Sequence, residues 1–171
     1  FGQTAPELSA SDLGNLYTDY YPRKHLSAED TRRSATWKPG WLAKGKRWLK
    51  GETNTCHYRI TPGTKVLDIG CGNGAALLEI KAQGAEAFGT EEDRNVQTVA
   101  EALQLQIHFG DVATSQWPDE YFDYITMSQL LEHIPDPTSF LDRVKKKLKP
   151  GGKIIMSFPN ISGWNRHRSG Q

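Results

Sequence analysis

The residues best suited to chemistry lie in the segment VLDIGCGNG, which spans residues 66–74. This segment follows a run typical of a buried strand and opens a predicted helix, so its glycines could bring the backbone close to a ligand. Asp68 stands just before those glycines. A carboxylate there would repel the phosphates that dinucleotide-binding loops hold at a helix N-terminus, whereas it suits a cationic ligand. A tight strand–helix turn that binds nothing is the alternative.

A second acidic position, Glu91, follows the next predicted strand. It comes about twenty residues after Gly70, a spacing at which a carboxylate can accept hydrogen bonds from both ribose hydroxyls. Its neighbour Glu92 could take the same role. Both could also be ordinary acidic residues at the start of a helix.

The segment VLDIGCGNG closely resembles the first motif of class I S-adenosylmethionine-dependent methyltransferases, and the resemblance runs from about residue 62 to residue 160. It implies S-adenosyl-L-methionine as cofactor and S-adenosyl-L-homocysteine as product. Gly70, Cys71 and Gly72 would line the methionine and ribose side of the cofactor. Asp111 would meet the adenine amino group, with the Val112 N–H at a ring nitrogen. An Asx turn after Gly110 is the other interpretation of Asp111.

The stretch from Met127 to Pro137 resembles the part of small-molecule methyltransferases that lies under the cofactor and faces the acceptor. It implies that Ser128, Gln129 and Leu130 are neighbours of the cofactor. His133 could remove a proton from a hydroxyl or amine acceptor. Methyl transfer can also proceed by positioning of the two substrates alone, and the pair Glu132-His133 could then simply orient a loop.

A metal site is a further interpretation of this stretch. Some ubiquinone-pathway O-methyltransferases resemble it and bind a divalent cation through a Glu-x-x-Glu-His run. Here Gln129 stands in place of the first carboxylate, and an amide is a weaker ligand for a hard cation. We therefore expect no metal.

Alternating strands and helices must position these residues. We expect strands over 65–69, 85–89, 106–109, 122–127 and 153–158, helices over 75–83, 95–103 and 138–148, and a turn at 150–152. This pattern predicts an α/β fold with a doubly wound, Rossmann-like, mostly parallel sheet. The family fold has seven strands, and residues 159–171 are too few for the last two. We therefore expect an incomplete sheet, whose open edge could support a homo-oligomer.

The chain divides into a predicted extension or lid, residues 1–60, and a cofactor-binding core, residues 61–171. Short helices are expected near residues 9–13 and over 40–51. The aromatic segment LYTDYYP, residues 16–22, could wall an acceptor site or pack against the core. It loosely resembles bacterial methyltransferases of sugar and cell-surface pathways, which suggests such an acceptor.

Composition limits the partners. The 171 residues carry 21 basic and 20 acidic side chains, for a net charge of +1, which argues against a general nucleic-acid binder. The basic cluster from Arg143 to Lys149 is interpreted as a solvated helix face. No apolar run reaches the ~18 residues of a membrane span. Cys56 and Cys71 are expected to be free thiols in a cytoplasmic protein.

The residues leave three functions open. A methyltransferase acting on a small-molecule acceptor fits the order of Asp68, Gly70, Glu91 and Asp111. An NAD-dependent oxidoreductase is favoured by the dinucleotide-like spacing of the glycines but opposed by Asp68. A non-catalytic cofactor-binding or interaction module is the third alternative.

Overall fold

The computed structural model describes residues 26–35 and 60–158. Within them one sheet contains β1 (Lys65–Ile69), β2 (Glu86–Glu91), β3 (Gln106–Phe109), β4 (Phe122–Ser128) and β5 (Leu148–Ser157). The α-helices of the described part are α2 (Ala28–Ser34), α4 (Ala75–Ala82), α5 (Gln97–Ala102) and α6 (Pro137–Lys147). Single 3-10 turns form η3 (Arg94–Val96), η4 (Val112–Thr114) and η5 (Leu131–His133).

The sheet has the strand order β3-β2-β1-β4-β5, and every neighbouring pair is parallel. The chain begins at the centre with β1, moves outward to β3 and returns to β4 on the other side of β1. The predicted Rossmann-like α/β fold is confirmed. In open sheets of this kind, ligands bind beyond the carboxyl ends of the strands, where the strand order reverses. Among the described strands, β3 and β5 form the two edges.

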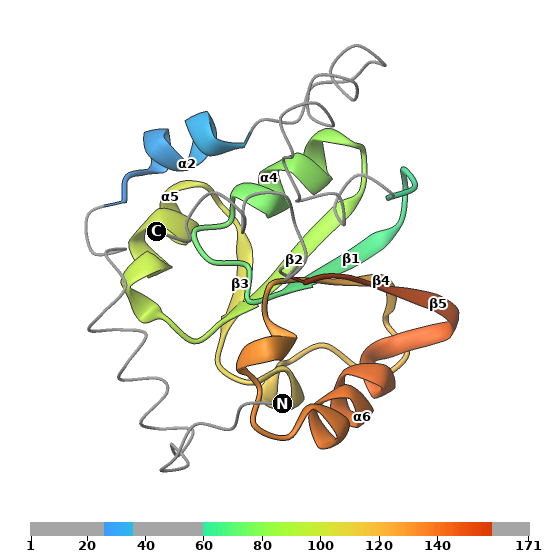
Figure 1. Ribbon diagram of the computed structural model, residues 1–171. Coiled ribbons are helices and arrows are strands. Elements are labelled where there is room, and N and C mark those ends of the chain that lie inside the picture. The colour runs from blue at the N-terminus through green and yellow to red at the C-terminus, as the bar shows by residue number, and fades with distance from the viewer. Residues whose placement is uncertain (1–25, 36–59, 159–171) are drawn as a thin grey trace, which may run out of the picture.

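Hydrophobic side chains cover both faces of the sheet. Val66 and Leu67 are both fully buried, and because successive side chains of a strand point to opposite faces, they belong to different clusters. Val66 packs with α4 residues such as Leu77, whereas Leu67 packs with α6 residues such as Phe140. Figure 1 shows α4 and α5 on one side of the sheet and α6 on the other. Burying one such side chain stabilises the fold by about 1.5–3 kcal/mol.

Helix α2 was not predicted from the sequence. Ser27 accepts a hydrogen bond from the Asp30 N–H, and Asp30 accepts one from the Ser27 N–H, so the two residues form a capping box. The Ser27-x-x-Asp30 spacing is the signal that could have found it. The helices expected near residues 9–13 and over 40–51 lie outside the described residues, as does the segment after Phe158.

Three predicted elements differ from the structure by more than one residue. The strand expected over 85–89 ends at Glu91 instead, so Glu91 belongs to the strand. The helix expected over 95–103 is divided into η3 and α5, because the Asp93 side chain caps Asn95 first. Strand β5 begins at Leu148, ahead of the predicted turn at 150–152. Leu148 pairs with Phe122 and Lys153 with Tyr124, so the extra residues between them form an irregularity in the strand. No helix of the described part is long and apolar enough to cross a membrane.

Candidate functional site

The glycine loop connects β1 to α4 and lies against the carboxyl end of β2. The N–H groups of Gly70 and Cys71 both donate to the Thr90 carbonyl oxygen, at 2.9 and 3.1 Å. Gly70 has a φ of 72°, which glycine adopts without strain. A Cβ there would lie 3.1 Å from Cδ1 of Leu130. The exposed backbone of Gly70 therefore depends on the absence of a side chain.

Glu91 is the last residue of β2 and ties that strand to the loop. Its Oε2 accepts the Gly72 N–H at 2.7 Å. Its Oε1 accepts the N–H groups of Glu92 and Asp93 at 2.9 and 3.0 Å. Hydrogen bonds to an ionised carboxylate are among the stronger ones in proteins. The Glu91 carboxylate is therefore fixed in orientation beside the glycine loop.

Asp68 lies behind the loop. It is 3% exposed, and its Oδ1 accepts the hydroxyl hydrogen of Thr126 at 2.6 Å. Thr126 itself is fully buried on β4, so this contact joins β1 to β4 beneath the loop. The next two residues, Ile69 and Gly70, line a cavity at the strand ends, and Asp68 does not. A contact between Asp68 and a cationic ligand stays a prediction.

Cys71 packs the loop onto β2. Its side chain is buried, and its Sγ lies 2.5 Å from the place that a Cβ of Gly89 would occupy. Gly89 therefore allows the loop to approach the strand this closely. Neither Cys71 nor Gly72 lines the cavity, and their predicted contacts with a cofactor stay predictions.

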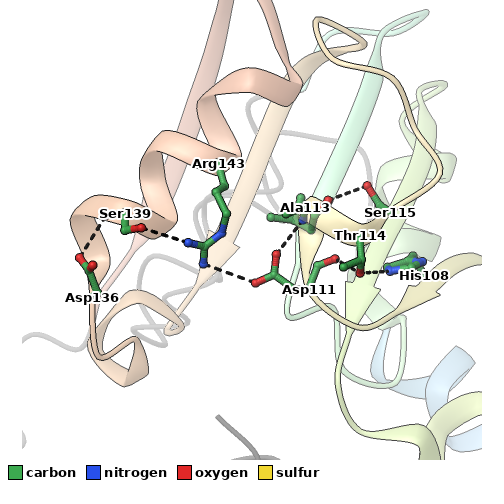
Figure 2. A network of polar contacts seen from close by, with 9 residues as sticks. His108, Asp111, Ala113, Thr114, Ser115, Asp136, Ser139 and Arg143 are labelled. Carbon is green, nitrogen blue, oxygen red and sulfur yellow. Dashed lines mark hydrogen bonds and ion pairs between the residues drawn. The ribbon is translucent and has the colours of Figure 1, made fainter. Parts of the chain in front are cut away.

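Asp111 and Val112 begin η4, directly after β3. Oδ1 of Asp111 accepts the Ala113 N–H at 2.7 Å, so the local turn that the sequence left open does form (Figure 2). Its Oδ2 lies 3.5 Å from Nη2 of Arg143 on α6. Val112 is 1% exposed and anchors η4 in the core.

The bend after β4 brings three predicted residues together. The Ser128 Oγ lies 3.0 Å from the Ser157 Oγ on β5. Gln129 donates its N–H to the Ser157 carbonyl oxygen at 2.9 Å and has a φ of 51°, an uncommon and strained conformation for a residue with a side chain. Leu130 then turns back against Gly70.

His133 ends η5 and has an exposed side chain. Its N–H donates to the Leu130 carbonyl oxygen at 2.9 Å. The His133 side chain belongs to the cavity lining, whereas its exposed neighbour Glu132 does not. Over residues 26–35 and 60–158, no group of three or more His, Cys, Asp or Glu is placed to hold a metal ion.

These elements surround one cavity of about 450 Å³ at the carboxyl ends of β1, β2 and β4. That volume falls within the ~300–1,000 Å³ range of small-molecule sites. The site residues predicted from the sequence that line this cavity are Gly70, Glu91, Glu92, Asp111, Val112, Ser128, Gln129, Leu130 and His133. The structure adds Ile69, Thr90, Gly110, Ile134, Pro135, Asp136, Ser139, Phe140 and Arg143.

The most informative of the added residues is Arg143, which was predicted to lie on a solvated helix face. Asp136, Ser139 and Arg143 follow one another at intervals of three and four residues. Such spacing puts side chains on one face of a helix. That periodicity is the signal by which this part of the cavity wall could have been found.

Negative charge gathers in this cavity. Although Glu92 is exposed by surface area, the protein around its carboxyl group desolvates it and raises its pKa, and the nearby Asp111 and Glu91 carboxylates add to the rise. Like charges disfavour ionisation of their neighbours. The wall formed by β2 and η4 therefore suits a ligand that brings hydrogen-bond donors or positive charge.

The reversal of strand order, the glycine loop and the cavity beyond the strand ends define a Rossmann-like α/β protein with a cavity of small-molecule size. A model of the methyltransferase domain matches residues 31–170, which is most of the chain. The chain belongs to this family of methyltransferase domains.

A relative from Idiomarina loihiensis, named ubiquinone biosynthesis O-methyltransferase, is 35% identical over 111 residues. The match covers 60% of this chain and 46% of the relative. The chain thus spans about half the length of the curated relatives it matches.

Solved structures share the fold. The [4+2]-cyclase SpnF matches with a TM-score of 0.61 and 17% identity, over 91% of this chain and 64% of its own. A chain from the complex between the Haloferax volcanii Trm112 methyltransferase activator and a methyltransferase matches with a TM-score of 0.56 and 23% identity, over 73% of this chain and 59% of its own. At these identities the likeness describes the fold alone.

Proposed function

We propose that this domain binds S-adenosyl-L-methionine in the cavity and that the protein transfers the methyl group to a small-molecule acceptor. The observation that carries this proposal is the meeting of the exposed Gly70 backbone with the carboxylates of Glu91, Glu92 and Asp111 in one cavity. Carboxylates accept hydrogen bonds from hydroxyl and amino groups and repel pyrophosphate. An adenosine that bears a cationic sulfonium fits such a wall better than a dinucleotide does.

The resemblance to S-adenosylmethionine-dependent methyltransferases supports a role for each of the predicted residues. Glu91 would accept the ribose hydroxyls, with Glu92 beside it on the same wall. Asp111 would accept the adenine amino group, and the Val112 N–H would serve a ring nitrogen. The bend at Ser128, Gln129 and Leu130 would form the surface under the cofactor, next to the glycine loop of Gly70, Cys71 and Gly72. Asp68 would act on the cationic end of the cofactor from behind this loop, directly or through water.

When bound, S-adenosylmethionine supplies a methyl carbon that is activated by the positive sulfur. The protein then has to align the acceptor atom with that carbon. His133 lies in the cavity wall and would take the proton that a hydroxyl or amine acceptor loses as its new bond to carbon forms.

The proposal extends to the atom of the acceptor that is methylated. The name of the Idiomarina relative supports an oxygen acceptor. Four other predictions from the sequence are compatible with this function and stay predictions. They are a sugar or cell-surface metabolite as acceptor, a lid formed by residues 1–60, a cytoplasmic location, and association through a sheet edge.

The proposed function is tested by transfer of labelled methyl from S-adenosylmethionine to a panel of acceptors. The panel contains catechol, a simple phenol, a free hexose and a primary amine, each incubated with the 171-residue chain. We expect labelling of at least one oxygen acceptor and inhibition by S-adenosylhomocysteine. Oxidation of NADH by the same preparation, without methyl transfer, would favour the oxidoreductase alternative and overturn the proposal.

A further inference from the structure

Arg143 links the two walls of the cavity. It extends from α6 toward η4, where its Nη2 lies 3.5 Å from Oδ2 of Asp111 (Figure 2). Both side chains are 39% exposed and both line the cavity. A half-exposed ion pair of this kind contributes little to stability, on the order of 0–1 kcal/mol. Its effect on the orientation of the two side chains therefore matters more than its effect on folding.

The Asp111 carboxylate is held from two directions. Its Oδ1 accepts the Ala113 N–H at 2.7 Å, a contact within its own turn. Its Oδ2 faces the Arg143 guanidinium, which belongs to a different element. With one oxygen fixed by the backbone and the other by α6, the plane of the carboxylate is defined. An ionised carboxylate offers about four acceptor positions, so these two contacts leave Asp111 the capacity to accept from a ligand.

Arg143 is itself oriented by its helix. Its Nη1 donates to the Ser139 Oγ at 3.2 Å, and the guanidinium carbon lies 5.9 Å from the centroid of the Phe140 ring. The Ser139 N–H in turn donates to Oδ1 of Asp136 at 3.0 Å, which caps α6. Figure 2 shows the polar contacts of Asp136, Ser139 and Arg143 as a continuous series from the start of α6 to Asp111.

Electrostatic attraction also favours the contact between Arg143 and Asp111. Among the described residues that line the cavity, Arg143 brings the one permanent positive charge, against the carboxylates of Glu91, Glu92, Asp111 and Asp136. The two contacts leave the Asp111 oxygens facing outward as hydrogen-bond acceptors, and an acceptor discriminates an amino group from a carbonyl oxygen.

We propose that Arg143 is a positioning residue for purine recognition, which orients the Asp111 carboxylate so that it selects the exocyclic amino group of adenine. This proposal rests on the proposed function, because it requires the adenosine moiety to occupy the cavity. It predicts that loss of Arg143 impairs discrimination between adenine and hypoxanthine more than it impairs binding as a whole.

The test compares calorimetric titrations with S-adenosylhomocysteine and with its deaminated analogue, S-inosylhomocysteine. The variants are Arg143→Met, Arg143→Lys and the control Lys146→Met, an exposed residue of the same helix outside the cavity lining. We expect the unmodified chain and the control to prefer the adenosyl compound by about tenfold or more, the scale of a hydrogen bond to a charged group. In Arg143→Met this preference should fall to about threefold or less, and Arg143→Lys should restore only part of it because an ammonium lacks the planar fork of a guanidinium.

An unchanged preference in Arg143→Met, or tighter binding of both compounds, would overturn the proposal, because Arg143 would then be neutral or would compete with the ligand for Asp111. If the unmodified chain binds neither compound, the proposed function fails, and this inference fails with it. Thermal unfolding of each variant shows whether the residue acts on the fold instead, and a large loss of stability in Arg143→Met alone would likewise contradict a positioning role.

Discussion

The two ends of the parallel sheet use charge in opposite ways. At the amino end, Lys65 pairs with Glu86 at 3.3 Å and Lys149 with Asp123 at 2.7 Å. Burial alone would raise the pKa of Asp123, but hydrogen bonds from the Lys149 ammonium and the Lys65 N–H outweigh it and hold that pKa below its usual range. Both of these carboxylates have a cationic partner.

At the carboxyl end the carboxylates of Glu91, Glu92, Asp111 and Asp136 line a cavity with one permanent cation among its described residues, Arg143, which lies 3.5 Å from Asp111. Glu92 has a raised pKa, because desolvation and then the Asp111 and Glu91 carboxylates disfavour its charge. Such crowding of like charges is unfavourable and is typical of functional sites. The difference between the two ends separates the charges that hold the fold from those that we propose bind a ligand.

The largest expected difference is between substitutions at the two ends of β2. Replacing Glu91 with Ala removes the acceptor of three backbone N–H groups. It should weaken S-adenosylhomocysteine binding by at least about 100-fold, or ~2.7 kcal/mol, and reduce the free energy of unfolding by about 1–3 kcal/mol. Calorimetric titration and chemical denaturation measure the two effects.

The matched control is Glu86→Ala, which removes only the exposed pair with Lys65. We expect a change of no more than about 0.5 kcal/mol in the free energy of unfolding and unchanged ligand affinity. Similar losses of affinity in both variants would show that charge at either end acts alike, and the proposed division between the two ends would be wrong.

A second variant, His133→Gln, tests whether chemistry as well as binding resides at the carboxyl end. If His133 takes the proton of the acceptor, kcat should fall by about 100-fold or more while S-adenosylhomocysteine affinity is retained. An unchanged kcat would mean that the protein works by positioning its two substrates alone. The control is Glu132→Gln, because Glu132 lies outside the cavity lining.

The smallest predicted effects are opposite pH dependences at the two ends. Because the folded-state pKa of Glu92 is raised, its contribution to stability is present below its ordinary pKa of about 4.3 and is lost as the pH rises through the folded value. Glu92→Gln should therefore stabilise the protein at neutral pH, by about 0.5 kcal/mol after allowance for solvent screening, and lose this advantage near pH 4.

Asp123 should behave in the opposite sense. Its lowered pKa means that its contribution is present above the ordinary value of about 3.9 and is lost as the pH falls through the folded value. Asp123→Asn should destabilise the protein at neutral pH by about 0.5 kcal/mol, with little effect below about pH 3. Urea denaturation across this pH range measures both variants, and equal signs at neutral pH would contradict the comparison.

The sequence predicted β1, β3 and the glycine loop well, because short apolar runs between glycines and turns admit few other structures. It predicted contacts of Gly70, Glu91 and Asp111 with one cofactor, and the structure brings the three together in one cavity, because parallel strands end at one edge of a sheet. It did not predict that Asp68 lies behind the loop, which depends on a hydrogen bond to Thr126 from a strand 58 residues away in sequence. It likewise missed Arg143, because its basic neighbours made the helix face look uniformly solvated.

The most direct test of the central claim is a calorimetric titration of the 171-residue chain with S-adenosylhomocysteine beside NADH. We predict that S-adenosylhomocysteine binds with a Kd on the order of 10 μM, equivalent to about −7 kcal/mol, and that NADH gives no measurable heat. Binding of NADH without S-adenosylhomocysteine would contradict the assignment of the carboxyl-end carboxylates to a sulfonium-bearing adenosine.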